Sequence, residues 1–576
     1  MKNLIITDRN NYTNPNQQIL YINKYCKNLK DFSILNFIED NSDLIKKEFK
    51  EDLKKLLNNL QKDKRFNVKK KYNLFYNFFL FDRSIYKYAS INEYLKIVAI
   101  KKFFEKKQNF SVNLKIKNKN LLICIKKILL DKKIEFKEKG INISIKINFL
   151  NFFLNIFRII KFIFKRLFLK SPSKKIINKK NSIISYLAYI DKKHLNKNDL
   201  KTIYWADIFS DKKNNFFFYI YNENSEKNLS KIYEIEKKKD SNFIILDSIL
   251  GLSDFFIIFF NWAKLVFNYY LKKKLLIFHF NNMNNSFKLF YDDIYNSTYG
   301  FDSFLNIYYS YLFEKLCKQK FRSQKTFYTS ENQGWEKSFN YFFKNKTKKI
   351  YAVISTPVRY WDTRYLDENN FIIGKNKKKY LPDFYAVNGK ISEKNLIKNN
   401  YSKKKIYQVE ALRYKVKNKK YTRKEKKNFL VAGDYNLDVN QKLEEIIIQL
   451  SKIYKKEIFY IKQHPNLKFG ERLKNIKNCI FVEDKDISEL SNYCGKAIIP
   501  NMTSASIDAV LNDLKTVVLY ADGQVNFSPL KDVKEILHEK DEKIIIKYFK
   551  KKLDKKINKN YFLNFNSNNK LWKKII

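Results

Sequence analysis

The chain has 576 residues, of which 115 are Lys or Arg and 58 are Asp or Glu, giving a formal net charge of +57. This length allows two or three domains, each with its own hydrophobic core. A nucleic-acid-binding protein would gather its charge on one face, beside stacking aromatic side chains. Here lysine is spread along almost the whole sequence, a bias typical of AT-rich coding, so we expect no specific nucleic-acid partner.

The rare residues are more informative than the common ones. The five cysteines are scattered without a CxxC pair, so neither a disulfide framework nor a zinc site is indicated. The N-terminus has too short an apolar run for a signal peptide, and we expect a cytoplasmic protein. Most of the ten glycines and seven prolines lie from Gly334 onward. Because they supply backbone geometry that other residues cannot, the second half is where the fold is most tightly specified.

Residues 1–173 are predicted to form an N-terminal accessory region of α/β type. Residues 3–7 and 120–130 have the apolar character of strands, with lysine-rich helical stretches between them. A Ser-Pro-Ser sequence at 171–173 marks the domain boundary that follows. The first 140 residues contain no motif to which we assign chemistry.

A helix predicted over residues 147–169 ends this region and has a very wide apolar face. Apart from Arg166, its polar residues recur every three to four positions, at Asn148, Asn151, Asn155, Arg158, Lys161 and Lys165. These charges argue against a membrane span. Two interpretations remain open: the helix lies in a membrane interface with its cations toward anionic headgroups, or it is buried against its own or a partner's core.

Residues 182–418 are predicted to form a second α/β region. A helix over 252–270 carries another thin polar stripe, to which the same two interpretations apply; its members are Asp254, Asn261, Lys264 and Asn268. Residues 275–280 predict a strand, and His279 inside it is given no functional role. Further strands are predicted at 349–355 and 384–387, and the lysine-rich stretch 415–427 is interpreted as a linker.

The segment 329–336 of this region gathers polar residues around Gly334 and Trp335. Ser330 with Gln333 matches a capping box, in which Glu331 would be the first helical residue. Alternatively, Glu331 faces an interdomain cleft and serves as a general base. A polar, aromatic turn follows the strand 349–355 at its carboxyl end and contains Pro357, Arg359, Trp361 and Arg364.

Residues 428–540 are predicted to form a third domain with a mostly parallel sheet. Apolar runs at 428–433, 457–462, 479–482, 496–499 and 516–520 alternate with helical patterns, the spacing of βαβ units. Asp438 with Gln441 predicts the cap of the first helix, and Asp486 predicts that of the helix 487–493. Ligands bind beyond the carboxyl ends of strands in such sheets. Several candidate residues lie there, namely Gly433, Asp434, His464, Pro465, Thr503, Ser504 and Ser506.

These candidates suit the binding of phosphate. A helix N-terminus offers unpaired N–H groups, and small hydroxyl residues such as Thr503, Ser504 and Ser506 let a phosphate approach closely. His464, fixed by Pro465, is placed to donate to a diphosphate. The polar loop with Asn526 and Ser528 is expected to line the same cleft. Taken singly, the hydroxyl cluster also fits an ordinary N-cap, and His464 fits a surface loop.

Metal chemistry is not indicated by these residues. Asp484-Lys485-Asp486 spells the D-x-D of metal-dependent glycosyltransferases, but its position before a helix favours a cap for Asp486. The sequence contains no zinc constellation and no Walker-type glycine loop. We therefore expect no metal and no cofactor.

The combination of a His-Pro after one strand with a Thr/Ser turn after a later strand resembles the donor site of two-Rossmann-domain (GT-B) glycosyltransferases. It is most similar to the group of bacterial capsule polysialyltransferases, Kdo transferases and CDP-glycerol glycerophosphotransferases. The second half also resembles an uncharacterised family of surface-carbohydrate biosynthesis. The resemblance covers residues 182–533, best from 329 on. It implies an α/β fold of two Rossmann-like domains facing a cleft, with the N-terminal α/β region as an addition.

The resemblance also implies a function and roles. The chain would move a sugar from a nucleotide-activated donor, with a CMP-linked sugar as one candidate, to a surface polysaccharide or lipid-linked acceptor of the capsule or lipopolysaccharide type. His464 with Thr503 and Ser504 would bind the donor phosphate. Polysialyltransferases use an acidic pair before Gly as base; the nearest match is Glu331, with Glu336 in reserve. Residues expected on the acceptor side of the cleft are Gln333, Trp335, Arg359, Trp361 and Arg364.

Two rival functions remain. One is transfer of a polyol phosphate from a CDP donor in the same cleft, and the other is a basic binding or scaffold protein without turnover. The expected location is the cytoplasm, with peripheral contact at the inner face of the cytoplasmic membrane as one interpretation. We expect residues 541–576 to form a solvated basic tail.

Overall fold

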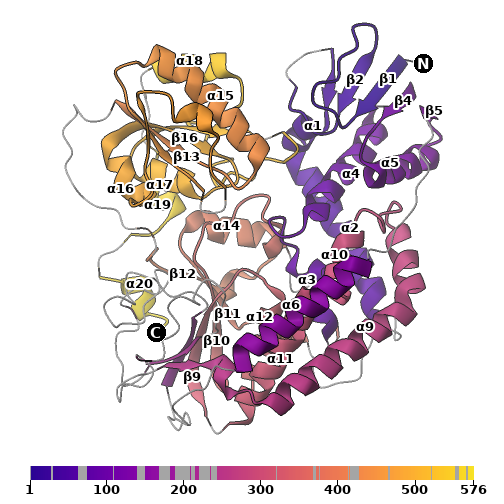
Figure 1. Cartoon of the computed structure of the whole chain (residues 1–576), viewed down its shortest axis with the longest axis vertical. Coiled ribbons are helices and arrows are strands. Elements are labelled where there is room, and N and C mark those ends of the chain that lie inside the picture. Colours follow the sequence, from indigo (N-terminus) through magenta and orange to yellow (C-terminus); the bar gives the residue numbers. More distant parts are fainter. Residues whose placement is uncertain are drawn as a thin grey trace.

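The computed structural model describes residues 2–26, 30–62, 74–107, 109–138, 149–167, 182–187, 208, 215–219, 234, 243–319, 321–366, 371–374, 377–412, 414, 427–464, 467–520, 522–551, 557–565 and 568–576. In these residues the chain forms three sheets, and every strand pair in them is parallel. Each sheet organises one domain, coloured indigo, magenta and orange in Figure 1.

The first sheet lies in the N-terminal region and has the strand order β3-β2-β1-β4-β5. Its strands are β1 (Lys2–Thr7), β2 (Gln18–Tyr21), β3 (Phe32–Ser33), β4 (Phe110–Lys115) and β5 (Phe136–Glu138). The helices around it are α1 (Ile34–Asp40), α2 (Ser42–Lys62), α3 (Phe79–Asp82), α4 (Ala89–Lys106) and α5 (Lys119–Asp131).

The strand predicted at 3–7 is confirmed, whereas the strand predicted at 120–130 is wrong. Those residues form α5, in which Leu121, Ile125, Ile128 and Leu129 are buried at helical spacing. Asn118 caps this helix, because its Oδ1 accepts hydrogen bonds from the N–H groups of Asn120 and Leu121 in the first turn, at 3.1 Å each. An apolar run alone did not distinguish a buried helix from a strand.

The second sheet has seven strands in the order β12-β11-β10-β9-β6-β7-β8. They are β6 (Ser182–Leu187), β7 (Asn215–Tyr219), β8 (Phe243–Ile245), β9 (Ser323–Thr329), β10 (Thr347–Ile354), β11 (Phe384–Val387) and β12 (Ile406–Gln408). The helices of this part are α6 (Phe149–Leu167), α9 (Leu252–Asn281), α10 (Tyr291–Thr298), α11 (Phe301–Lys318), α12 (Gly334–Phe343) and α14 (Lys390–Lys398).

Two predicted strands of this region are confirmed as β10 and β11, and one is wrong. Residues 275–280 continue α9, with Leu276 and Phe280 buried four residues apart on its inner face. His279 therefore lies on a helix and is half-buried.

The third sheet has the order β15-β14-β13-β16-β17-β18. Its strands are β13 (Asn428–Ala432), β14 (Phe459–Lys462), β15 (Cys479–Phe481), β16 (Cys494–Pro500), β17 (Lys515–Leu519) and β18 (Leu537–Glu539). All five predicted strands of this domain are confirmed. The helices are α15 (Leu437–Ile453), α16 (Ile487–Leu490), α17 (Ala505–Leu511) and α18 (Glu542–Lys550). The strand order reverses between β13 and β16, which makes this the topological switch point where ligands of open α/β sheets bind.

Two details of the third domain differ from prediction. The cap of α15 is Asn436, whose Oδ1 accepts from the N–H of Asp438 at 2.9 Å, so Asp438 is not the cap. Asp486 does occupy the cap position of α16, as predicted, and its backbone N–H donates to Glu489 at 3.3 Å.

The described residues of the segment 541–576 do not form a solvated tail. In α18, Ile545 and Phe549 are buried against the third sheet. The chain then crosses to the second domain through α19 (Lys559–Phe562), where a Cβ on Gly389 would lie 2.1 Å from the carbonyl oxygen of Phe562. In α20 (Lys570–Lys573), Trp572 is 1% exposed and donates from Nε1 to the carbonyl oxygen of Glu410 at 2.9 Å. The end of the chain thus links the two domains.

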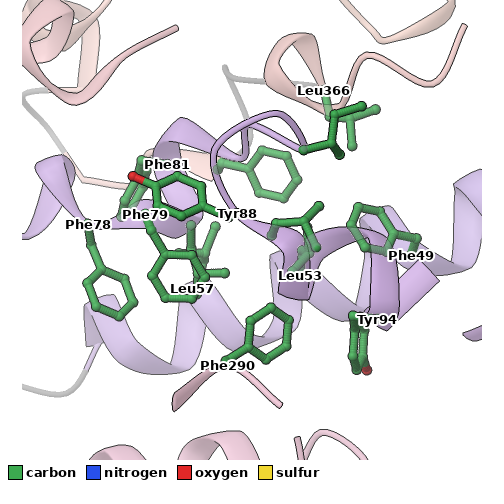
Figure 2. Packing of buried hydrophobic residues seen from close by; sticks show 14 of the residues in the cluster. Phe49, Leu53, Leu57, Phe78, Phe79, Phe81, Tyr88, Tyr94, Phe290 and Leu366 are labelled. Carbon is green, nitrogen blue, oxygen red and sulfur yellow. The ribbon is translucent and has the colours of Figure 1, made fainter. Parts of the chain in front are cut away.

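The first and second domains share one continuous hydrophobic core. Figure 2 shows its centre, where Phe49, Leu53 and Leu57 of α2 pack with Phe290 and Leu366 of the second domain. The third domain has separate cores on the two faces of its sheet. The molecule therefore consists of two Rossmann-like domains of the predicted GT-B type, with an additional N-terminal α/β domain that shares its core with the second domain.

Candidate functional site

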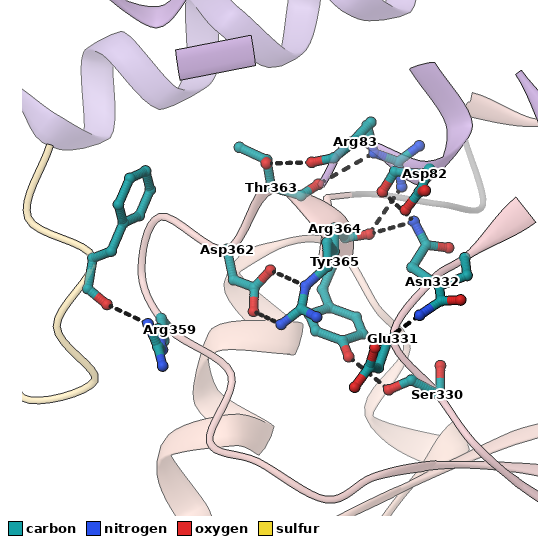
Figure 3. Close-up of polar contacts among 12 residues, drawn as sticks. Asp82, Arg83, Ser330, Glu331, Asn332, Arg359, Asp362, Thr363, Arg364 and Tyr365 are labelled. Atoms are coloured by element: carbon teal, nitrogen blue, oxygen red, sulfur yellow. Dashed lines mark hydrogen bonds and ion pairs between the residues drawn. The ribbon is translucent and has the colours of Figure 1, made fainter. Parts of the chain in front are cut away.

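Arg359 lies at the boundary between the second and third domains. It belongs to the loop after β10, is 8% exposed, and donates from Nη1 to the carbonyl oxygens of Met502 at 2.6 Å and Phe527 at 3.3 Å. Met502 follows β16 and Phe527 lies in the loop between β17 and β18. The carboxyl ends of two sheets are thus joined by a fixed cation (Figure 3).

Asp434 and His464 lie at the carboxyl ends of β13 and β14 in the third domain. Asp434 is 2% exposed, and burial raises the pKa of its carboxyl, while the nearby charges of His464 and Arg359 act in the opposite direction. Asn440 locks the backbone of Asp434 through hydrogen bonds of 2.8 and 3.0 Å. The carboxylate of Asp434 is therefore within electrostatic reach of the imidazole of His464 and of the guanidinium of Arg359 from the second domain.

Gly433 allows this close approach. A Cβ at this position would lie 3.0 Å from the backbone N of His464 and 3.1 Å from the ring of Phe469. The imidazole of His464 packs edge-on against the ring of Tyr435, with 6.1 Å between centroids. His464 is half-buried and Tyr435 is 44% exposed, so this corner of the site opens to solvent. Pro465 lies outside the described residues.

The predicted hydroxyl cluster lies at the start of α17, next to the switch point. Thr503 Oγ1 accepts from the N–H of Ala505 at 3.2 Å, and Ser506 Oγ donates to the carbonyl oxygen of Thr503 at 3.4 Å. Ser506 is 0% exposed, whereas Thr503 and Ser504 are half-buried. Ser504 occupies the cap position without a side-chain capping bond. Thr503 and Ser504, and not Ser506, are placed to contact a ligand.

The side chains of Asn526 and Ser528 form hydrogen bonds within their own loop. The Oδ1 of Asn526 accepts from the N–H of Ser528 at 3.0 Å, and Ser528 Oγ accepts from the N–H of Leu530 at 3.0 Å. The backbone N–H of Asn526 donates to Glu39 of the first domain at 3.0 Å. Both residues are buried and hold the loop that supplies the carbonyl of Phe527 to Arg359.

The predicted capping box of Ser330 and Gln333 is wrong. Helix α12 begins at Gly334, and the cap pairs Gln333 with Glu336, whose Oε1 accepts from the N–H of Gln333 at 2.9 Å. Glu336 also accepts from the N–H of Glu331 at 2.7 Å and from Ser330 Oγ at 2.8 Å. Burial raises the pKa of Glu336 to about 7. With three donors on its carboxylate, Glu336 shapes the loop and does not have the freedom of a general base.

Glu331, in contrast, presents a half-exposed carboxylate. Its Oε2 accepts from Gln333 Nε2 at 2.8 Å, and Gln333 Oε1 in turn accepts from Trp335 Nε1 at 2.8 Å. This relay orients the carboxylate and leaves it accessible. The relay also gives Gln333 and Trp335 supporting roles, because Trp335 itself is 9% exposed and packs on Phe313 and Tyr328.

Asn332 is an anchor that the sequence did not reveal. It adopts a left-handed φ of 57°, and its Nδ2 donates to three carbonyl oxygens, those of Phe81 at 2.8 Å, Asp82 at 3.2 Å and Arg364 at 2.7 Å. Lys337 donates to its Oδ1 at 2.5 Å. Figure 3 shows how Asn332 ties the Glu331 loop to the first domain and to the loop after β10.

Arg364 and Trp361 differ in their surroundings. Arg364 forms a bidentate ion pair with Asp362, at 2.8 and 2.9 Å, and its guanidinium lies 5.0 Å from the ring centroid of Tyr86. The same ring lies 5.5 Å from the guanidinium carbon of Arg359. Trp361 is 1% exposed and belongs to the core. Tyr86, from the first domain, therefore separates two arginines and is a second residue that sequence reasoning missed.

A cavity of ≈ 990 Å³ opens on the other side of the switch point, between the first and third domains. Tyr25 and Tyr520 stack inside it with 4.5 Å between ring centroids. Residues at the start of α15 and α18 also line it, among them Asp438, Gln441 and Asp541. The first domain thus covers one side of the third domain's carboxyl edge. In the described part of the chain no group of His, Cys, Asp and Glu could hold a metal ion.

Comparisons with known proteins give no family. No family model and no curated protein matches the chain. Among solved structures it is similar to UDP-N-acetylglucosamine 2-epimerase from Rickettsia bellii, with 9% identity over 66% of this chain and 90% of that chain and a TM-score of 0.38. It is also similar to Anabaena Alr3699/HepE in complex with UDP and glucose (9% identity, 64% and 90%, TM-score 0.34) and to the glycotransferase of kitacinnamycin (10%, 63% and 87%, 0.34). The sheet orders described above give the Rossmann-like fold independently of these similarities.

Proposed function

We propose that the chain is a GT-B glycosyltransferase that moves a sugar from a nucleotide-activated donor to a surface polysaccharide or a lipid-linked acceptor. One observation carries the proposal: Arg359 of the second domain and His464 of the third both lie within electrostatic reach of buried Asp434, after strands of two different parallel sheets. A guanidinium and an imidazole at a switch point can both donate hydrogen bonds to the diphosphate of a nucleotide sugar.

The proposed donor site lies on the third domain. The phosphates would contact His464 and the turn of Thr503 and Ser504, while Arg359 contributes its charge from the opposite side. Met502 and Phe527 hold Arg359 in place before any ligand arrives, so no reorganisation is needed as negative charge develops on the leaving phosphate. The chain's own cations would supply this stabilisation, which makes a metal ion unnecessary in the proposed mechanism.

The proposed general base lies on the second domain. Glu331 would take the proton of the acceptor hydroxyl as that oxygen attacks the anomeric carbon, and the bond from that carbon to the phosphate oxygen would break with inversion. The relay through Gln333 and Trp335 fixes the carboxylate for this role. Glu336 would act only by shaping the loop that carries Glu331.

Product analysis tests this function. The purified full chain is incubated with CMP-, CDP-, UDP- and GDP-linked sugars and an acceptor polysaccharide. The masses of the products are then measured by mass spectrometry. A glycosyltransferase releases the complete nucleotide and adds a sugar without phosphate. Phosphate retained in the new linkage would instead identify a CDP-polyol phosphotransferase, and a donor converted without any acceptor would exclude transfer.

A further inference from the structure

Helices α6 and α9 expose an unusual amount of apolar surface. Most of the large hydrophobic side chains that are exposed in the described part of the chain lie on these two helices. On α6 they are Phe153, Leu154, Phe157, Ile160 and Phe164, and on α9 they are Leu252, Phe256, Ile257, Phe260, Phe267, Tyr270, Leu271 and Phe278. Phe157 is 66% and Phe260 is 69% exposed.

The two helices form one surface. Both pack on α11: Phe162 of α6 contacts Tyr308 with ring centroids 4.9 Å apart, and Trp262 of α9 donates to Ser303 Oγ at 2.9 Å. They also touch each other, since the rings of Phe152 and Trp262 stack at 6.3 Å. In Figure 1, α9 follows the lower right margin of the molecule and α6 lies inward of it, in a similar direction. We call their exposed side chains the α6–α9 face.

Some polar residues of these helices point inward instead. On α6, Arg166 is buried and pairs with Asp247 at 3.0 Å, and Asn155 is 7% exposed. On α9, Asp254 is buried and contacts Lys315 and Tyr311 of α11. Exposed phenylalanines and buried ion pairs are the reverse of the distribution that the hydrophobic effect favours in water. Exposed apolar patches rimmed by polar residues mark sites of interaction with proteins or membranes.

The charges beside the α6–α9 face have one sign. Helix α6 contains no acidic residue, and the single acidic residue of α9 is the inward Asp254. Exposed cations accompany the phenylalanines, with Arg158 and Lys161 on α6 and Lys264 and Lys274 on α9. On α6, one side of the helix carries Phe153, Phe157, Ile160 and Phe164 at helical spacing. Arg158 and Lys161 lie along one flank of this apolar side.

We propose that the α6–α9 face docks on an anionic phospholipid bilayer, with its phenylalanines inserted at the boundary of headgroups and acyl chains and its cations on the headgroups. A second copy of the chain fits less well, because it would bring the same cations together. No described helix is long and apolar enough to cross a membrane, so α6 and α9 would lie along the surface. The inference stands independently of glycosyl transfer.

Vesicle sedimentation tests this docking with the full chain. Vesicles of phosphatidylcholine with about one third phosphatidylglycerol should pellet the protein, and vesicles of phosphatidylcholine alone should pellet much less. General attraction of a strongly basic chain to anionic lipid must be separated from insertion of the α6–α9 face. The triple variant Phe157→Ser, Phe256→Ser, Phe260→Ser keeps the net charge and should weaken binding by about tenfold or more, especially in high salt, where surface charge is screened.

A matched control introduces serine at exposed apolar positions outside the α6–α9 face. Leu130 on α5 and Leu437 on α15 are 61% and 56% exposed, and Leu130→Ser with Leu437→Ser should leave vesicle binding unchanged. All five positions are exposed, so circular dichroism should show unchanged folding. The proposal is overturned if the triple variant binds as wild type does. It is also overturned if wild type ignores vesicles and forms a dimer in light scattering that the triple variant does not form.

Discussion

The guanidinium of Arg359 and the carbonyl oxygen of Met502 lie 2.6 Å apart and join the second domain to the switch point of the third. This bond places a permanent cation against the strand ends where Asp434 and His464 lie. It therefore has two consequences, one for the stability of the domain arrangement and one for the affinity of an anionic ligand.

Replacing Arg359 separates these consequences. Arg359→Ala removes a charged donor from two buried carbonyls and should lower the free energy of unfolding by about 2 kcal/mol, measured by urea titration. Arg359→Lys keeps the charge but cannot reproduce the planar geometry, and should retain more nucleotide affinity than Ala. Arg322→Ala, at an exposed position, is the control and should change neither quantity. Equal behaviour of the Lys and Ala variants in ligand binding would contradict an electrostatic role.

Glu331 and Glu336 should respond differently to the same isosteric change. Glu331→Gln should lower the rate of transfer about a hundredfold or more at unchanged stability, because it removes the proposed base. Glu336→Gln should lower stability by about 1–3 kcal/mol, because a carboxylate that accepts from three donors is lost. Initial rates and thermal melts of both proteins, with Glu314→Gln on α11 as control, decide the assignment. An active Glu331→Gln enzyme would remove this carboxylate from the mechanism.

Asn332 should be among the most sensitive positions outside the reacting groups. Asn332→Ala leaves three carbonyls without their donor and puts an alanine at a left-handed φ, so we expect a loss of about 3 kcal/mol or more. Asn569 also has a left-handed φ, of 49°, and Asn569→Ala should cost only about 1 kcal/mol. Chemical denaturation of both variants measures the difference. Similar losses of stability in the two variants would mean that backbone strain alone explains the effect of Asn332→Ala.

His538 should make stability depend on pH. It lies on β18, and burial lowers its pKa from 6.5 to about 4. Between these values the unfolded chain binds a proton that the folded protein excludes, so stability is fully present above pH 6.5 and falls as the pH drops toward 4, by on the order of 3 kcal/mol. His538→Gln should flatten this part of the melting profile, whereas His279→Gln on α9 should not. A profile unchanged by His538→Gln would refute this source of acid sensitivity.

The sequence predicted the third domain best, for a physical reason. Parallel strands covered on both faces are short uninterrupted apolar runs, and the runs at 428–433 and 516–520 end at Gly433 and before Asp522. The same signal was misleading at 120–130, which forms the buried helix α5, and at 275–280, which continues α9 with Leu276 and Phe280 on its inner face. The wide apolar stripes on α6 and α9 were recognised, but only the structure showed that the phenylalanines face outward.

The candidate site was predicted in part, because its geometry depends on distant segments. His464 and Asp434 follow strands directly and could be found from the chain order. Tyr86 could not, since it reaches the two arginines from the first domain and is one of 40 tyrosines. The cap of α12 was assigned one turn too early, because Asn332 takes a left-handed conformation that only its contacts to Phe81 and Arg364 explain.

The most direct test of the account is a thermal-shift titration of the full chain with CMP, CDP, UDP and GDP. Wild type and the control His279→Ala should be stabilised by at least one of these nucleotides, by about 2.7 kcal/mol at a hundredfold excess over the Kd, and His464→Ala should show a clearly smaller shift. If none of the four nucleotides raises the Tm, or if His464→Ala responds as wild type does, the proposed donor site beside Arg359 and Asp434 is contradicted.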